Sequence, residues 1–218
     1  MAVAMRAFTQ MTTQPEERST LAWPTGTAVG DLAVLVVEGA DRPGPMNRGG
    51  WVGITAGGST AAWYKTVTSG DLVSPVTARG KLTGLQTFTG AAGIGKSRAT
   101  VGVPLSVAGA GVLLFSSAPP PATQVLPTTD RVGTGVKEDD DWMHQVFWLP
   151  RTATGYAELA GCDGWALYYA WEVLPSVGPQ APTLVSPLAG AQVDTAAAVP
   201  FSWLPSSSAA QEQCKVRI

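Results

Sequence analysis

Residues 19–38 read Ser19-Thr20-Leu21-Ala22-Trp23-Pro24-Thr25-Gly26-Thr27-Ala28-Val29-Gly30-Asp31-Leu32-Ala33-Val34-Leu35-Val36-Val37-Glu38, and this stretch decides the fold class. A polar and apolar segment leads into a Pro/Gly turn, and Gly30-Asp31 then opens an unbroken aliphatic run at 32–38. Aliphatic and β-branched residues bounded by turn residues are typical of strands. The stretch therefore predicts the start of an antiparallel β-sandwich.

Similar strand-like runs recur along the chain with turn residues between them. Large apolar residues alternate with smaller or polar ones most clearly at 60–68 and 164–174, as a sheet with one buried face requires. Only 10–19 has a composition that allows a helical turn, and a loose segment fits it equally well. We therefore predict an all-β chain built as an antiparallel, jelly-roll-like β-sandwich. Strands are expected at 32–38, 51–55, 61–68, 82–89, 100–107, 110–117, 143–149, 155–160 and 164–174.

The composition of the 218 residues indicates a protein that contacts other proteins. Charged residues make up only 14% of the chain, against about 25% in an average soluble domain. A surface with so few charges is expected to face protein over much of its area. The formal net charge is −2 and no basic run occurs, so no nucleic-acid partner is expected.

The sequence also predicts the cellular setting. Residues 1–6 lack the apolar core of a signal peptide. No stretch reaches the roughly 20 apolar residues of a membrane helix. Synthesis in a cytosol without membrane association is therefore expected. Cys162 and Cys214 form neither a disulfide framework nor a metal site by spacing, so two free thiols are the default expectation.

The texture of the chain changes near residue 175. A Pro-rich stretch at 176–182 predicts an extended linker, after an N-terminal arm at 1–19 and a β-sandwich domain at 20–175. Residues 183–218 are similar to the first strands of an immunoglobulin-like or fibronectin type III-like module, with Trp203 as its core aromatic. Such a sandwich takes about 100 residues to close. Either a partner completes this module or the chain is the front portion of a longer protein, and the second alternative is favoured.

One string matches a nucleotide-binding pattern. Residues 90–97 read Gly90-Ala91-Ala92-Gly93-Ile94-Gly95-Lys96-Ser97, which fits the phosphate-cradling motif G-x-x-x-x-G-K-[ST]. That motif needs a helix directly after it to supply part of the anion site. Gly102 and Pro104 preclude a helix there. A Gly-rich hairpin loop is the favoured interpretation, and no cofactor is expected.

Two further features carry candidate chemistry. The acidic run at 138–141 offers oxygen ligands for Ca²⁺, but it lacks the alternating spacing of a calcium loop, and a solvated loop is favoured. His144 is the single histidine and has no nucleophile signature beside it. A hydrogen-bonded strand histidine is therefore favoured over a general base. No catalytic or metal-binding residue is predicted, and the chain is not expected to be an enzyme.

The tryptophans are the remaining candidates for binding. Trp63, Trp165, Trp171 and Trp203 lie on strand-like runs and are predicted to be core. Trp51, Trp142 and Trp148 border loops and have the rings needed to stack on sugars, although sandwich core is favoured here as well. The candidate contacts for a glycan or a protein partner are Trp51, Trp142, His144 and Trp148.

Several short strings fall in an order that resembles the β-sandwich domain of minor tail proteins from siphophages of actinobacteria, including mycobacteriophages. In addition, Ser186-Pro187 followed by Gly190-Ala191 resembles the start of the immunoglobulin-like repeats in such proteins. This chain departs from the family at Arg48-Gly49-Gly50-Trp51-Val52, where Pro-x-Gly-Trp-Thr is usual, and at the long insert 118–141. The strings are Thr27-Ala28-Val29-Gly30-Asp31-Leu32, Gly50-Trp51-Val52, Trp63-Tyr64-Lys65-Thr66-Val67-Thr68, Thr87-Phe88-Thr89-Gly90-Ala91 and Gly164-Trp165-Ala166-Leu167-Tyr168.

The resemblance implies a virion structural protein of the distal tail, a minor tail, tail-tip or fibre-base component assembled in the host bacterial cytoplasm. It implies no catalytic residues. The expected partners are other phage tail proteins and further copies of the chain, with a trimer favoured, and host cell-wall glycan as a further partner in host attachment. The alternative is a carbohydrate-binding adhesin that recognises that glycan through exposed aromatic rings. A third hypothesis, a cell-wall-degrading enzyme, lacks paired carboxylates or a triad in the sequence.

Overall fold

The computed structural model describes the chain in two compact units, Met1–Ser176 and Val177–Ile218. The acidic run 138–141, Trp142, Trp165, Cys162 and Cys214 lie outside the described residues, so the predictions made for them remain predictions. The described residues are 2–13, 18–39, 44–46, 49–54, 60–80, 82–118, 131–136, 143–151, 153–159, 167–176, 183–186 and 202–204.

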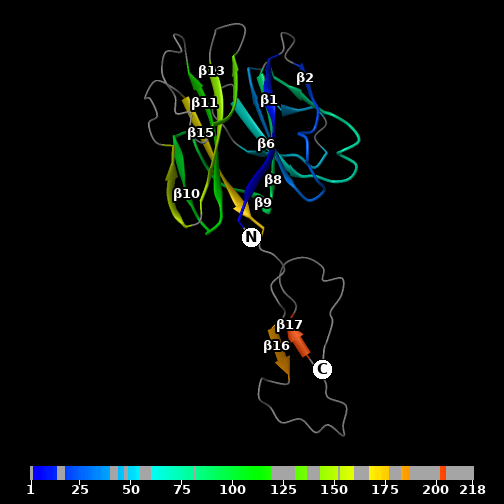
Figure 1. Ribbon diagram of the computed structural model, residues 1–218, viewed down its shortest axis with the longest axis vertical. Coiled ribbons are helices and arrows are strands. Elements are labelled where there is room, and N and C mark those ends of the chain that lie inside the picture. Colours follow the sequence, from blue (N-terminus) through cyan, green and yellow to red (C-terminus); the bar gives the residue numbers. More distant parts are fainter. Residues whose placement is uncertain are drawn as a thin grey trace. The chain divides into compact units, whose positions relative to one another are not determined.

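The first unit is built on two antiparallel sheets, each of five described strands (Figure 1). The first sheet has the order β1 (Ala4–Thr13), β8 (Leu82–Thr89), β3 (Leu32–Glu38), β6 (Thr60–Thr66) and β5 (Val52–Ile54). The second has the order β12 (Arg131–Val136), β13 (Met143–Pro150), β11 (Gly111–Ala118), β15 (Leu167–Pro175) and β9 (Ala91–Arg98). The two sheets pack face to face as a sandwich, which confirms the predicted all-β class.

Two smaller sheets cover the outer faces of this sandwich. β2 (Arg18–Leu21), β7 (Val76–Arg79) and β4 (Gly44–Pro45) form one, and β10 (Gly102–Leu105) and β14 (Gly155–Glu158) form the other. The central strands are therefore buried on both faces, and all seven residues of β3 are buried. This explains why β3 is a continuous aliphatic run and does not alternate, since each of its faces meets an apolar layer.

Successive residues along a strand face opposite sides of its sheet and so belong to different parts of the core. Val34 on β3 faces the second sheet and packs into one apolar cluster with Phe115 and Trp171. Its neighbour Leu35 faces outward and packs with Leu21 of the covering sheet. Full burial of one such aliphatic side chain contributes about 1.5–3 kcal/mol. The side chains on both faces of β3 thus stabilise the fold.

The turn before β3 holds the N-terminal strand in place. The Asp31 carboxylate accepts a hydrogen bond from the Ala28 backbone N–H at 2.8 Å and pairs with the Arg6 guanidinium at 2.7 Å. Gly30 adopts a φ of 90° in this turn, a conformation that side chains disfavour. Arg6 lies on β1, so this ion pair, of which only the Asp31 side chain is buried, ties β1 to the turn.

Several local predictions were wrong. The segment expected as an N-terminal arm contains β1, an edge strand whose pairs with β8 lie 69 to 85 residues apart in the sequence, from Thr13 opposite Leu82 to Ala4 opposite Thr89. The Gly-rich segment expected as a hairpin loop is strand β9, because Gly90, with a φ of 68°, makes the turn alone. Gly44-Pro45, which lies outside every expected strand, pairs with β7 as β4. All three depend on pairing with distant residues.

In the second unit, β16 (Thr183–Ser186) pairs antiparallel with β17 (Ser202–Leu204). These two strands lie where the first strands of an immunoglobulin-like module are predicted. Over the described part of the chain, no helix combines the length and apolarity that a membrane crossing would require.

Candidate functional site

The four residues predicted as contacts do not form one site. Trp148 is only 8% exposed and its ring lies 4.7 Å from the ring of Phe88, centroid to centroid, inside the sandwich core. It therefore cannot present a ring face at the surface, and its assignment as a contact is corrected. His144 pairs through its backbone with Ser117 and Gly135 in the second sheet. Trp142 lies outside the described residues.

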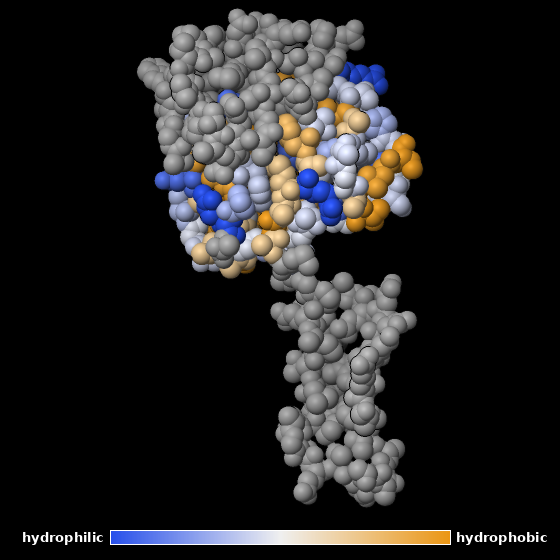
Figure 2. All heavy atoms as spheres, viewed as in Figure 1, coloured by the Kyte–Doolittle hydropathy of each residue, from blue (hydrophilic) through white to orange (hydrophobic). Residues whose placement is uncertain are grey.

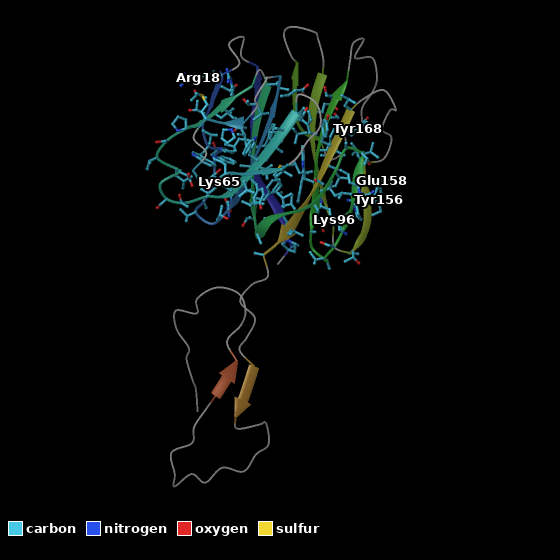
Figure 3. The ribbon with its side chains drawn as sticks, turned by 180° about the vertical axis from the view of Figure 1, so that it is seen from behind. Arg18, Lys65, Lys96, Tyr156, Glu158 and Tyr168 are labelled. Atoms are coloured by element: carbon cyan, nitrogen blue, oxygen red, sulfur yellow. The ribbon has the colours of Figure 1, made fainter. Side chains whose placement is uncertain are left out.

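Trp51, in contrast, lines a cavity of about 250 Å³ on the outer face of the first sheet. We call this cavity the tryptophan pocket. Its walls are the segment before β5, the end of β6, and the loop from β6 to β7. In Figure 3, the label of Lys65 marks the side of the first unit on which this pocket lies. The residues that line the pocket are Trp23, Gly49, Trp51, Lys65, Gly70, Asp71, Ser74, Pro75, Val76 and Thr77.

Lys65 is the central charged group of the tryptophan pocket. Its Nζ donates to the Gly49 carbonyl oxygen at 3.0 Å and to Asp71 Oδ1 at 2.5 Å. It also lies 5.8 Å from the centroid of the Trp51 ring, within range of a cation–π contact. The side chain is 9% exposed. Because an isolated buried ammonium is costly, these contacts explain how a lysine is tolerated on a core-facing strand.

Asp71 organises the loop opposite. One carboxylate oxygen, Oδ2, accepts hydrogen bonds from the backbone N–H of Thr68 at 2.8 Å and from its hydroxyl at 2.7 Å. Partial burial by itself would raise the pKa of the Asp71 carboxyl. The hydrogen bonds from Lys65 and Thr68, with the Lys65 charge, outweigh burial and lower that pKa. The carboxylate therefore stays ionised at neutral pH.

Trp23 closes the same loop from the other side. Its indole N–H donates to the backbone carbonyl oxygens of Asp71 at 2.7 Å and Ser74 at 2.9 Å. These bonds fix the orientation of the ring as well as the path of the loop. The tryptophan pocket thus combines two indole rings with an ammonium, a carboxylate and hydroxyl groups.

This arrangement favours ligand binding over catalysis. The Lys65 ammonium and the Asp71 carboxylate are paired with each other, which leaves neither as a strong base or nucleophile. Among the described residues, no three His, Cys, Asp or Glu side chains gather where they could hold a metal ion. The pocket offers two indole rings and paired polar groups, and more of its lining surface is polar than apolar.

Of the residues around this cavity, the sequence indicates Trp51 as a candidate contact, which stays a prediction, and it does not indicate Trp23, Lys65 or Asp71. Trp23 belongs to the turn before β3, and Lys65 occupies one position in the alternation of β6. One signal could have found Lys65, since a lysine at a core-facing position of a strand requires an acceptor nearby. The sequence does not identify Asp71 as that acceptor, because the contact depends on how the loop after β6 folds.

A second surface lies on the other outer layer, over the second sheet. It surrounds a cavity of about 250 Å³ lined by Ala99, Thr100, Val101, Leu167, Tyr168 and Tyr169. Leu167 and the neighbouring Tyr156 are each 53% exposed. The hydroxyls of Tyr156 and Thr100 are hydrogen-bonded at 3.2 Å, which places Tyr156 at the edge of this cavity. We call Tyr156, Thr100 and Leu167 the tyrosine surface. Figure 3 shows Tyr156 and Tyr168 on the opposite side of the unit from Lys65.

Comparisons of this chain with protein-family models, with curated proteins and with solved structures found no match. The functional interpretation therefore rests on the residues of the two surfaces and on the sequence motifs.

Proposed function

We propose that this chain is a structural protein of a phage virion, a component of the distal tail that acts through protein–protein assembly. Two sequence features support the proposal: the ordered strings that resemble actinobacteriophage minor tail proteins, and the low content of charged residues. On the face that Figure 2 presents, strongly hydrophilic residues occur in small groups among apolar ones. Such a surface is compatible with extensive burial against other proteins.

The tyrosine surface is the observation that carries this proposal. Exposed Leu167 and Tyr156 lie beside an apolar cavity. A partner that covers them would remove this apolar surface from water, which is favourable. The Tyr156 hydroxyl donates to the Gly102 carbonyl oxygen at 3.3 Å, in addition to its bond with Thr100, so the ring is held before any partner arrives. Ordered aromatic side chains beside pockets are the usual anchors of protein interfaces.

The partner proposed for this surface is a further copy of the chain, with other tail proteins as additional partners. Tail components are commonly arranged in rings, and a trimer is the favoured state. In such a ring, the tyrosine surface of one copy would contact a different surface of the next. A single charged substitution there should therefore weaken every interface of the ring.

The test is the mass of the full chain in solution, measured by light scattering over a dilution series. We expect a trimer that dissociates on dilution, and Leu167→Asp should weaken association at least about tenfold, which corresponds to about 1.4 kcal/mol per interface. The matched control is Val73→Asp, which places the same charge at an apolar residue that is 82% exposed and outside the tyrosine surface.

Circular dichroism of both variants establishes that they are folded. A chain that is monomeric at every concentration would contradict the assembly proposal. Equal association of the wild type and folded Leu167→Asp would remove the tyrosine surface from it.

A further inference from the structure

We propose that the tryptophan pocket binds one neutral, hydroxyl-rich sugar ring of a glycan, with Trp51 as the stacking ring and Lys65 and Asp71 as the polar contacts. The pocket lies on the opposite outer layer from the tyrosine surface, so this inference does not rest on the proposed assembly. It concerns Trp23, Trp51, Lys65 and Asp71, which converge from four separate segments of the chain.

The aromatic groups provide the apolar part of the site, which is smaller than its polar part. Trp51 is only partly buried: its ring packs against the apolar cluster under the covering sheet, Lys65 Nζ lies over it, and the cavity reaches the remainder. Trp23, whose N–H is engaged by two loop carbonyls, also lines the cavity and packs against the same cluster. Sugar rings present C–H faces that pack against aromatic faces, as apolar groups do. Two indole rings at one cavity therefore favour a ligand with both apolar faces and polar edges.

The polar groups provide the larger part of the lining. A lysine ammonium has three N–H donors, and two of those on Lys65 go to Gly49 and Asp71. The third has no acceptor among the residues that the structure describes. Asp71 Oδ1 accepts only the Lys65 bond there, although a carboxylate oxygen can accept two. Among the described residues, one Lys65 donor and one Asp71 acceptor position thus have no protein partner, and the two groups lie side by side.

A sugar hydroxyl pair matches this arrangement. Each hydroxyl both donates and accepts a hydrogen bond, so one can accept from the Lys65 ammonium while its neighbour donates to Asp71. The charges of Lys65 and Asp71 neutralise each other, so a phosphate or a carboxylate sugar would meet repulsion from Asp71 as well as attraction to Lys65. The chemistry therefore favours a neutral ring.

The size of the tryptophan pocket limits the ligand to a single unit. Its volume of about 250 Å³ is below the range of about 300–1,000 Å³ for drug-sized ligands. The loop is held by its own hydrogen bonds, from Asp71 N–H to the Thr68 carbonyl oxygen at 3.1 Å and from Ser74 N–H to that of Asp71 at 3.2 Å. A preformed site loses little conformational entropy on binding.

The experiment uses the full chain and follows tryptophan fluorescence and calorimetric heat during titration with methyl glucoside, methyl galactoside, their oligosaccharides and, as the charged comparison, glucuronic acid. We expect at least one neutral sugar to bind with a dissociation constant of about 1 mM, and glucuronic acid to bind more weakly. Trp51→Ala should reduce affinity at least about tenfold, with Trp51→Phe, which keeps a ring, intermediate.

Tyr156→Ala is the matched control, because it removes an exposed ring from the opposite layer and should leave sugar binding unchanged. Leu167→Asp should likewise retain sugar binding even where it abolishes assembly, which separates the two proposals. Thermal unfolding of each variant checks that the fold is retained, and saturation-transfer NMR on the wild type tests directly whether sugar C–H groups contact aromatic protons.

Three outcomes would overturn the proposal. The first is the absence of binding by every neutral sugar at concentrations well above 1 mM, and the second is tighter binding of glucuronic acid than of the neutral sugars. The third is full binding by folded Trp51→Ala. Any of these would leave Lys65 and Asp71 as groups that only stabilise the loop.

Discussion

Replacement of Trp171 by alanine is expected to lower the free energy of unfolding of the first unit by about 3–5 kcal/mol. Trp171 is 1% exposed and stacks on Tyr169 with ring centroids 6.4 Å apart, in the cluster that joins the two sheets. The substitution removes this packing and leaves a cavity that the rigid sheets cannot collapse to fill. Since small domains have a total stability of about 5–15 kcal/mol, the variant should be close to unfolding at 37 °C. Urea denaturation followed by circular dichroism measures the change.

Val73→Ala is the control for Trp171→Ala, because Val73 is exposed in the loop after β6 and should change stability by less than about 0.5 kcal/mol. Trp171→Phe should fall between the two, since it keeps an aromatic ring against Tyr169. A loss below about 1 kcal/mol for Trp171→Ala would show that the sheets do not pack on this ring, given the usual cost of such a truncation.

Glu172→Gln is the substitution with the second-largest expected effect, a loss of about 1–3 kcal/mol at neutral pH. Glu172 is fully buried on β15. Its carboxylate accepts hydrogen bonds from the backbone N–H and the hydroxyl of Ser106, the latter at 2.7 Å, and from the Lys96 backbone N–H at 3.1 Å. Glutamine replaces one acceptor oxygen with an N–H₂ donor, which leaves a buried donor facing donors. Chemical denaturation at pH 7 measures the loss.

The same carboxylate predicts a pH dependence of stability. Burial alone would raise the pKa of Glu172, but the hydrogen bonds from Ser106 and Lys96, with the Lys96 charge, lower it below the ordinary value of 4.5. A carboxyl whose folded pKa is lowered stabilises the fold above its unfolded pKa and loses that contribution as pH falls through the folded pKa.

The stability difference between the wild type and Glu172→Gln should therefore be constant above about pH 5 and shrink below about pH 4.5. Leu167→Ala, an exposed substitution on the same strand, should show no such dependence on pH. A difference that stays constant down to pH 3 would contradict the role given to the ionised carboxylate.

The strands with strong local signals could be predicted from the sequence, and those that depend on distant partners could not. The expected bounds of β3 and β8 agree with the structure at every residue, because each consists mainly of apolar or β-branched residues and ends beside a glycine. β1 carries no such run, and only its register with β8 makes it a strand. β9 differs from the expected loop because Gly93 and Gly95, after Gly90, are typical of loops, while its partner β15 supplies the pairing.

For the candidate site, the sequence indicates which type of residue is involved but not whether its side chain lies at the surface or in the core. Trp51 and Trp148 both border turns in the sequence, yet Trp51 lines a surface cavity and Trp148 is buried between the sheets. The side of a strand on which a ring lies is set by parity, and parity has meaning only once each face of the sheet is known. The pairing of Lys65 with Asp71 likewise depends on the loop after β6, which brings Asp71 back beside that strand.

The sequence by itself determined that this protein is all-β, where its central strands lie and that little of its surface is charged. These properties follow from local patterns of side-chain polarity, β-propensity and turn residues. Only the tertiary structure decided that four layers cover one another, that Trp148 belongs to the core, and that Trp23, Trp51, Lys65 and Asp71 share one cavity. Those properties depend on contacts between residues far apart in the chain, which hydrophobic burial selects when the sheets pack together.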